Sequence, residues 1–377
     1  MTYEEIISEI YSSYSLNQKL IINRFDREIK NPEICFAIAK KHGLLFQKEN
    51  VIRITGSKGK GTTSQFISRF LMKNTDVSVG LMISPEELEH YDRIRINGES
   101  ISRDEFISFY MKSKAVKEYL NFPFSGLNYA SPYGLFLLLA LEVFKEKNVK
   151  YLVLESGRGF LHDDLYFFPS EIGVITSIFE EHLNSLGPTL EDVKKEKEGI
   201  YDHSKKVFSF NDVPKIDLRD QKPNWLKMNY ELSKLVVRDF LKKETLMEIE
   251  MSSPSLIEFK DKGVSYHLEA LISEESLDLN FLKSLDPTKT HVFLCIPDDK
   301  DYLRVEEKLK EHALSFTHIL IDSKKASLQF SKFRNPSLGP FQENEDFLKL
   351  IQNESKDKAK ILIFGTHSFL RAIKKTL

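Results

Sequence analysis

A short glycine-rich segment constrains the fold of this 377-residue chain more than any other part of its sequence. Residues 56–62 are Gly-Ser-Lys-Gly-Lys-Gly-Thr, close to the phosphate-loop pattern G-x-x-x-x-G-K-[ST] but with closer glycines and an added glycine before the hydroxyl. The apolar run at 51–54 predicts a strand, and the apolar spacing of residues 62–73 predicts a helix. Strand, glycine loop and helix in this order are typical of a phosphate-binding loop.

The chemistry of the loop follows from its residue types. Glycines let backbone N–H groups curl around phosphate oxygens, and the N-terminus of the following helix adds partial positive charge. Lys60 supplies a charge for the outer phosphates, and Thr62 supplies a hydroxyl for Mg²⁺. The alternative is a glycine-rich turn that carries a surface lysine, which the flanking strand and helix disfavour. The predicted nucleotide-binding residues of the loop are Gly56, Ser57, Lys58, Gly59, Lys60, Gly61 and Thr62.

The composition is that of an ordinary globular protein, with 41% hydrophobic and 29% charged residues, and the length favours two domains. A net charge of −2 provides no general basic field, so we expect neither a nucleic-acid nor a membrane partner. Two widely spaced cysteines, Cys35 and Cys295, fit a reducing compartment better than a disulfide or zinc framework. The polar N-terminus is not typical of a signal peptide, and we therefore expect a cytoplasmic location.

Strands that alternate with helices predict mostly parallel sheets covered on both faces. The first domain is expected to span residues 1–250 and the second to span residues 251–377, with a linker at 251–255. The main elements expected after the loop are strands at 77–83, 151–155, 172–176, 264–268, 291–296, 318–321 and 360–364, and helices at 132–146, 225–243 and 273–284. The predicted fold class is α/β: a P-loop-containing parallel-sheet ATPase domain followed by a smaller Rossmann-like α/β domain.

Several polar residues follow the predicted strands directly. Ser84, Glu155 and the segment 176–182 all lie at or just after strand ends, as the glycine loop does. In open α/β sheets, ligands bind at the carboxyl ends of the strands. We therefore expect these residues to form one site.

Four segments of the first half carry a series of motifs. They are GSKGKGT at 56–62, ISPEEL with DRIRINGESIS within 83–102, ESGRGFLHD at 155–163, and ITSI, EH, LGPTL and EKEGI between 175 and 200. In order and spacing these segments resemble the folylpolyglutamate synthase and dihydrofolate synthase branch of the Mur ligase family. The family's counterparts are roughly G-T-N-G-K-G-S, T-S-P-H-L with E-R-I-R-I-N-G-E-x-I-S, E-V-G-L-G-G-R-L-D, and I-T-S-I-x-x-D-H with L-G-x-T and I-A-x-E-K-x-G-I. The resemblance implies an ATP-dependent ligase that joins an amino group to a carboxylate.

The resemblance also implies metal and catalytic residues. Ser84, Glu155 and His182 match the family's Mg²⁺-contacting positions, with Thr62 as the loop's own hydroxyl ligand. Lys197 matches the lysine that these ligases carry as a carbamate, and the implied catalytic residues are Lys60, Lys197 and His182. Simpler alternatives remain open: Ser84 ends a strand, His182 is a structural histidine, and Lys197 is a solvated lysine in a charged helix. Glu155 is harder to dismiss, because a carboxylate at the end of an apolar strand is costly to bury without a partner.

The second half resembles the family less. Asn229 matches the family's adenine-contacting asparagine, and Asp299 lies in a retained D-K-D at 299–301 that is expected to contact the nucleotide. Glu86 replaces the family's histidine, and Leu161 replaces an arginine that Arg158 is placed to substitute. These departures affect the substrate side more than the nucleotide and metal side.

The expected function is that of a ligase that adds L-glutamate to a folate or pteroate through an acyl phosphate, with ATP and Mg²⁺, as a monomer. The alternatives are a Mur-type ligase with another carboxylate and amine, a degenerate ATP-binding protein without turnover, and a nucleotide kinase or motor-type NTPase. The last is disfavoured because no apolar run ends in Asp-Glu.

Overall fold

The structure, a computed structural model, describes the chain except for a set of short segments. These are residues 22–23, 127, 215–223, 253–255, 272–273, 275–276, 299–301, 323–329, 331–333, 343–345, 355–357 and 375–377. The chain forms two compact units, one of Met1–Ile216 with Lys227–Glu250 and one of Asp217–Leu226 with Met251–Leu377.

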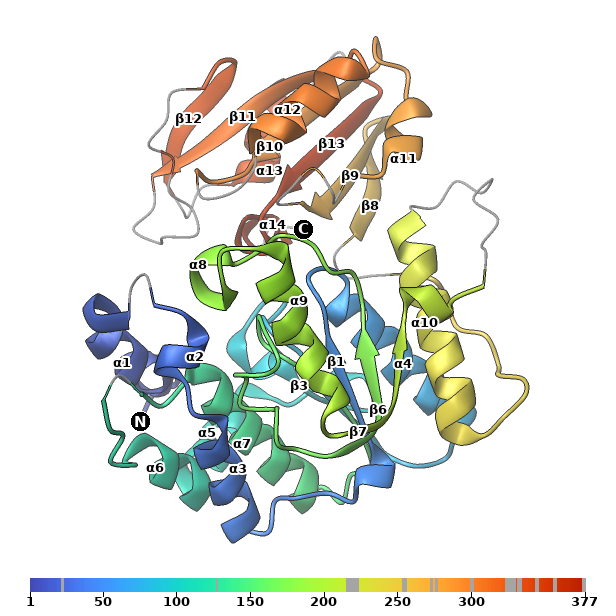
Figure 1. Ribbon diagram of the computed structural model, residues 1–377. Helices are drawn as coiled ribbons and strands as arrows, with labels where there is room; N and C mark the ends of the chain where they lie inside the picture. The colour runs from blue at the N-terminus through green and yellow to red at the C-terminus, as the bar shows by residue number, and fades with distance from the viewer. Residues whose placement is uncertain are drawn as a thin grey trace. The chain divides into compact units, whose positions relative to one another are not determined.

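The first unit is built on a mostly parallel sheet with the strand order β4-β3-β2-β5-β1-β6-β7 among the described residues (Figure 1). Its strands are β1 (Val51–Thr55), β2 (Val79–Met82), β3 (Ile94–Ile96), β4 (Glu99–Ser100), β5 (Tyr151–Glu155), β6 (Ser170–Ile175) and β7 (Ser204–Ser209). Five neighbouring strands, β2, β5, β1, β6 and β7, run parallel. At one edge β3 pairs antiparallel with β2, and β4 pairs antiparallel with β3. The strand of the glycine loop, β1, therefore lies between β5 and β6.

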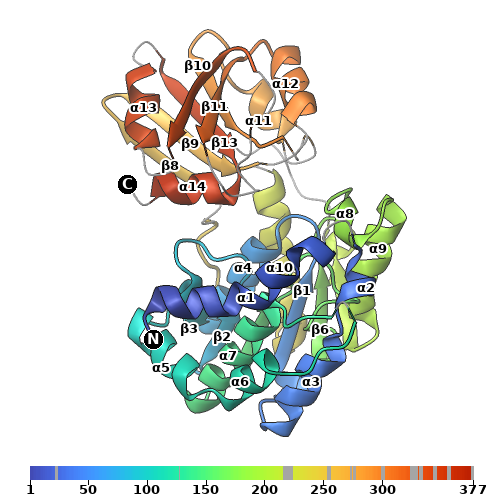
Figure 2. The same cartoon turned by 90° about the vertical axis from the view of Figure 1, so that its left-hand side faces the viewer.

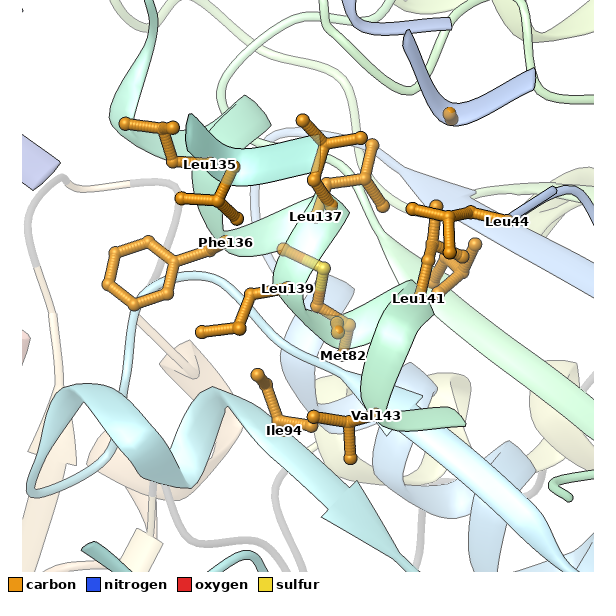
Figure 3. Packing of buried hydrophobic residues seen from close by; sticks show 14 of the residues in the cluster. Leu44, Met82, Ile94, Leu135, Phe136, Leu137, Leu139, Leu141 and Val143 are labelled. Carbon is orange, nitrogen blue, oxygen red and sulfur yellow. The ribbon is translucent and has the colours of Figure 1, made fainter. Parts of the chain in front are cut away.

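Helices cover both faces of this sheet (Figure 2). They are α1 (Tyr3–Ile21), α2 (Asp26–Ile29), α3 (Pro32–Lys41), α4 (Lys60–Asn74), α5 (Arg103–Lys112), α6 (Lys114–Leu120), α7 (Pro132–Glu146), α8 (Leu183–Leu186), α9 (Leu190–Glu198) and α10 (Asn224–Leu241). Helix α7 is the buried apolar helix that the sequence predicts, and α1, α3, α5 and α6 pack around it. In Figure 3 its leucines lie beside Leu44, Met82 and Ile94. None of the described helices is both long and apolar enough to cross a membrane.

The alternation of side chains along β5 decides which way its last residue points. Leu152 and Leu154 belong to the core around α7. Because successive side chains of a strand point to opposite faces, Glu155 points to the face on which α4 lies. The polar end of an otherwise apolar strand is thereby aimed at the glycine loop.

Arg53, in the middle of β1, is fully buried and ties the sheet to the segment between β5 and β6. Its Nε donates to Ser170 Oγ at 3.0 Å, and its Nη2 donates to Ser204 Oγ at 2.9 Å. Its Nη1 donates to the carbonyl oxygens of Leu165 and Tyr166, at 3.2 and 2.8 Å. Burial lowers the pKa of Arg53 to about 9. The run predicted as apolar thus carries a buried cation whose hydrogen bonds stabilise the loop's strand.

The second unit is a smaller α/β layer with the strand order β12-β11-β10-β13-β9-β8 in its described part. Its strands are β8 (Leu256–Asp261), β9 (Val264–Ala270), β10 (Thr290–Cys295), β11 (Ser315–Asp322), β12 (Ser337–Gln342) and β13 (Lys360–Gly365). Its helices are α11 (Leu279–Lys283), α12 (Tyr302–Glu311), α13 (Phe347–Glu354) and α14 (His367–Lys374). All neighbouring strands run parallel except β8, which is antiparallel to β9. The predicted α/β fold class is confirmed.

Four strands, β4, β7, β8 and β12, were not predicted from the sequence, and all four lie at sheet edges. Their alternation is poor because an edge strand exposes much of its length, and β12 also contains a glycine and a proline. Of the helix predicted at 273–284, residues 273, 275 and 276 lie outside the described residues, and the helix that the structure describes there is α11. It begins at Leu279, because the side chain of Asp278 caps it by accepting from the N–H groups of Asn280 and Phe281.

Candidate nucleotide-binding site

The glycine loop turns sharply between β1 and α4, and two of its glycines have backbone angles that favour glycine. Gly56 has a φ of +141° and Gly59, at the N-cap of α4, has a φ of +91°. A Cβ on Gly56 would lie 1.9 Å from Thr176 Oγ1, and a Cβ on Gly59 would lie 2.4 Å from Asn229 Oδ1. Backbone conformation and close packing therefore both require glycine at these two positions.

The loop is fastened to the segment that follows β6. The N–H of Ser57 donates to the Ser177 carbonyl at 2.6 Å, and the N–H of Lys58 donates to Ser177 Oγ at 3.0 Å. Ser57 Oγ accepts from the N–H of Phe179 at 3.1 Å. The loop therefore contacts the segment 176–182, as predicted. The N–H groups that begin α4 are suited to bind phosphate, since the first N–H groups of a helix have no partner within it.

Two lysine side chains meet at one carbonyl oxygen of the loop. Lys60 Nζ donates to Gly56 O at 2.8 Å, and Lys197 Nζ, from α9, donates to the same oxygen at 2.9 Å. Lys197 is fully buried and also donates to Arg158 O at 2.9 Å and to Glu181 Oε1 at 2.8 Å. Lys197 is therefore not the solvated lysine of the simpler alternative.

Burial lowers the pKa of Lys197 to about 8, although the Glu181 carboxylate raises it. Lys60 lowers it further, because two ammonium groups near one another disfavour the second charge. A lysine with this pKa has a larger neutral fraction near pH 8 than an exposed lysine.

Glu155, the last residue of β5, lies beside the start of α4. It is buried, and its Oε2 accepts from the N–H of Ser84 at 3.1 Å. A Cβ on Gly61 would lie 3.4 Å from the same oxygen, which places the carboxylate beside the first turn of α4 and the buried Thr62. Burial raises the pKa of Glu155 to about 7, although Lys60 lowers it.

The arrangement of Thr62, Ser84 and Glu155 fits Mg²⁺. Mg²⁺ prefers oxygen ligands, keeps several waters and is commonly held by one or two carboxylates together with substrate phosphates. Within the described residues, no group of three or more His, Cys, Asp or Glu side chains is placed to hold a metal ion alone. Thr62, Ser84 and Glu155 are thus suited to an ion that arrives with a nucleotide.

His182 is at the Lys197 side of the site. It has a left-handed backbone, with φ of +49°, and its side chain is 39% exposed. Its Nε2 lies 3.9 Å from Glu181 Oε2, so Glu181 connects the histidine with Lys197. Glu181 was absent from the predicted site, although it stands beside His182 in the motif.

Asn229 does not lie open to solvent. It is only 2% exposed, and its Oδ1 accepts from Thr63 Oγ1 at 2.6 Å. Thr63 is a second residue that was absent from the predicted site, because only its hydrogen bond to Asn229 of α10 connects it with the other site residues. Asp299, the other predicted nucleotide contact in the second half, lies outside the described residues.

The departures from the family pattern have partners of their own. Glu86 is buried and forms an ion pair with Arg93, whose Nε donates to Glu86 Oε2 at 2.8 Å. Arg158 forms a two-point pair with Asp26, with Nε to Oδ2 at 3.0 Å and Nη2 to Oδ1 at 2.5 Å. Arg158 is therefore engaged with α2, and this pairing disfavours its acting in place of the arginine lost at Leu161.

A substitution in the loop separates steric fit from backbone strain. Gly56→Ala places a Cβ against Thr176 in a left-handed position, and we expect it to destabilise the first unit by about 2 kcal/mol and to weaken ATP binding at least about tenfold. Urea unfolding and calorimetric titration with ATP measure the two effects. Gly43→Ala is the matched control, since Gly43 has a φ of +69° but open space around its Cβ position. Equal destabilisation by both changes contradicts the steric argument.

Comparison with known proteins agrees with this geometry. The Mur ligase middle domain family matches residues 54–270. A dihydrofolate synthase/folylpolyglutamate synthase of Buchnera aphidicola is 31% identical over 182 residues, which are 48% of this chain and 41% of that protein. The chain thus spans less than half the length of the curated relatives it first matches, 32% and 41%.

Two of the solved structures that resemble this chain cover 100% and 92% of it. One, an FPGS–AMPPCP–folate complex, matches with a TM-score of 0.72 and 17% identity, covering 100% of this chain and 99% of that one. The other, a bifunctional folylpolyglutamate synthase/dihydrofolate synthase with Mn, AMPPNP and L-glutamate bound, matches with a TM-score of 0.71 and 16% identity, over 92% of this chain and 94% of that one. At such identities the likeness establishes the fold.

Proposed function

We propose, from the premise that the chain belongs to the Mur ligase family through its middle domain, that it is an ATP-dependent ligase adding L-glutamate to a folate or pteroate. The observation that carries the proposal is the convergence of Lys60 and Lys197 on Gly56 O, with the buried Glu155 carboxylate beside the first turn of α4. A lysine cation at a phosphate loop, together with a buried carboxylate suited to Mg²⁺, favours transfer of a phosphoryl group to a carboxylate.

The proposed reaction has two steps. An oxygen of the substrate carboxylate attacks the γ-phosphorus of ATP, the bond to ADP breaks, and an acyl phosphate forms. The amine of L-glutamate then attacks the acyl carbon, an amide bond forms, inorganic phosphate leaves and the amine loses a proton. Lys60 neutralises charge on the transferred phosphoryl group, and the N-terminus of α4 orients the phosphates.

Mg²⁺ would be held by Thr62, Ser84 and Glu155 on one side of the loop, and His182 is proposed to serve the other side. When bound, the ion supplies charge neutralisation between the phosphates and the substrate carboxylate. We also propose that Lys197 reacts with CO₂ to give a carbamate. The support is its burial and its lowered pKa, because only the neutral amine reacts with CO₂.

The choice of folate and L-glutamate rests on the named relatives, one of which is a complex with folate and another a complex with L-glutamate. Glu86 and Leu161 stand where the family has a histidine and an arginine, so a Mur-type ligase with a different carboxylate and amine is the second candidate. A nucleotide-binding protein without turnover is the third.

Phosphate release measured with each substrate left out in turn tests the proposal. We expect release from ATP and Mg²⁺ only when a folate or dihydropteroate and L-glutamate are both present, with a product one glutamyl residue heavier by mass spectrometry. Release that needs another carboxylate and amine, such as UDP-sugar peptides with amino acids, supports the second candidate. ATP binding without release under every acceptor would exclude ligation.

A further inference from the structure

Helix α10 places one side chain directly on the glycine loop. Asn229 comes from the first turns of α10, about 170 residues after the loop, and is only 2% exposed. A Cβ added to Gly59 would lie only 2.4 Å from Asn229 Oδ1, so the amide leaves no room for a side chain there. The same oxygen accepts from Thr63 Oγ1 at 2.6 Å. The amide therefore touches both the N-cap of α4 and the residue that follows Thr62.

A second hydrogen bond from α10 supports this contact. Ser233, one turn further along, donates through Oγ to Asn229 O at 2.7 Å and lies 3.2 Å from Thr63 O. The Tyr230 ring packs against the rings of Phe66 and Phe70, at centroid distances of 5.3 and 5.1 Å. The first turns of α4 and α10 are thus joined by buried polar bonds and by aromatic packing.

The resemblance to the family implies that Asn229 contacts adenine. The geometry points to a different role, and we propose that Asn229 is a positioning residue for the phosphate-binding loop that acts on the phosphate end of the nucleotide. This inference rests on the proposed nucleotide binding. Asn229 fills the space next to Gly59 and accepts a hydrogen bond from the hydroxyl of Thr63.

The physical reason is the freedom of glycine. Without a side chain, Gly59 has access to many backbone conformations, and only its surroundings keep it at a φ of +91°. Asn229 occupies the space next to Gly59 and thereby restricts its backbone conformations. The hydrogen bond from Thr63 Oγ1 to Asn229 also holds the first turn of α4 in place. The N–H groups that meet the phosphates are then preorganised before a nucleotide arrives, which lowers the ordering cost of binding.

The two roles of Asn229 predict different losses of affinity. In Asn229→Ala we expect Mg-ATP and inorganic tripolyphosphate each to bind about tenfold more weakly by calorimetric titration. We expect the ratio of ATP to GTP affinity to stay unchanged. If Asn229 serves adenine instead, ATP binding falls, tripolyphosphate binding is kept and the ATP-to-GTP ratio drops, and that result overturns the inference.

Thr63→Val provides a second, nearly isosteric variant that removes only the hydroxyl donor. We expect it to weaken ATP and tripolyphosphate as Asn229→Ala does, and the double variant to be no more than about threefold weaker than either single variant, because both remove one contact. Additive losses in the double variant contradict the inference. Arg238→Ala, at an exposed position of α10, is the matched control and should bind like wild type. A wild-type protein that binds neither ligand would refute the phosphate loop itself, whereas intact binding without these losses refutes only the role of Asn229.

Discussion

Lys60→Ala is expected to weaken ATP binding about tenfold to a hundredfold, as loss of a charge-assisted hydrogen bond to phosphate costs about 1.5–3 kcal/mol. At saturating ATP we expect the ligation rate to fall by about a further 100- to 1000-fold, because the charge that Lys60 neutralises grows in the transition state. The ammonium lies at 2.8 Å from Gly56 O, in reach of any phosphate held by the loop. Calorimetric titration and phosphate release measure the two effects separately.

Lys73→Ala is the matched control for this change. Lys73 is an exposed lysine in the last turn of the same helix, so its loss alters net charge and helix composition equally without touching the loop. We expect wild-type affinity and rate. Unchanged ATP affinity in Lys60→Ala would show that the loop does not bind the nucleotide through this lysine.

Lys197→Ala is expected to lower ligation by about 100- to 1000-fold and to destabilise the first unit by about 3 kcal/mol, because it removes the buried ammonium that pairs with the Glu181 carboxylate. The side chains of Lys197 and Glu181 are 0% and 8% exposed, so solvent screens their pair little. Glu181→Gln in the same background removes the remaining carboxylate charge. We expect the double variant to regain stability while ligation stays low.

The carbamate role of Lys197 has its own signature. With ¹³CO₂ we expect a carbamate carbon signal in the wild-type spectrum that Lys197→Ala lacks, and partial rescue of the variant's ligation by a short carboxylic acid. At a fixed concentration of dissolved CO₂ the signal should grow from pH 7 to pH 9, since burial lowers the pKa of Lys197 to about 8 and the neutral amine increases above it. Full ligation by Lys197→Ala would exclude the carbamate.

The geometry of the glycine loop was predictable because its residues are close in sequence. About a dozen consecutive residues are enough to predict a strand, a glycine turn and the start of a helix. In the structure Gly56, Gly59 and Lys60 lie between β1 and α4, as this pattern predicts. Ser84 and Glu155 were predictable for a related reason: both end apolar strands, and parallel strands bring such ends to one edge.

Contacts between segments far apart in the sequence were not predictable. Asn229 reaches Thr63 across 166 residues, and nothing in the local pattern of either shows the hydrogen bond. Arg53 is a similar case, because a single arginine in an apolar run is equally typical of a strand edge. The two serines and the carbonyl oxygens of Leu165 and Tyr166 explain how its guanidinium is buried without a carboxylate. Packing across the sheet, which has no local sequence signal, decides both.

The position of Lys60 at the glycine loop has a practical consequence for any binding measurement. Its ammonium is a cationic group in reach of a phosphate held by the loop, and sulfate, phosphate or citrate from a buffer will compete for it. Titrations in such buffers will therefore understate the affinity for ATP, and the apparent affinity will fall as ionic strength rises. A chloride or acetate buffer of low ionic strength is the medium in which the loop and its variants can be compared.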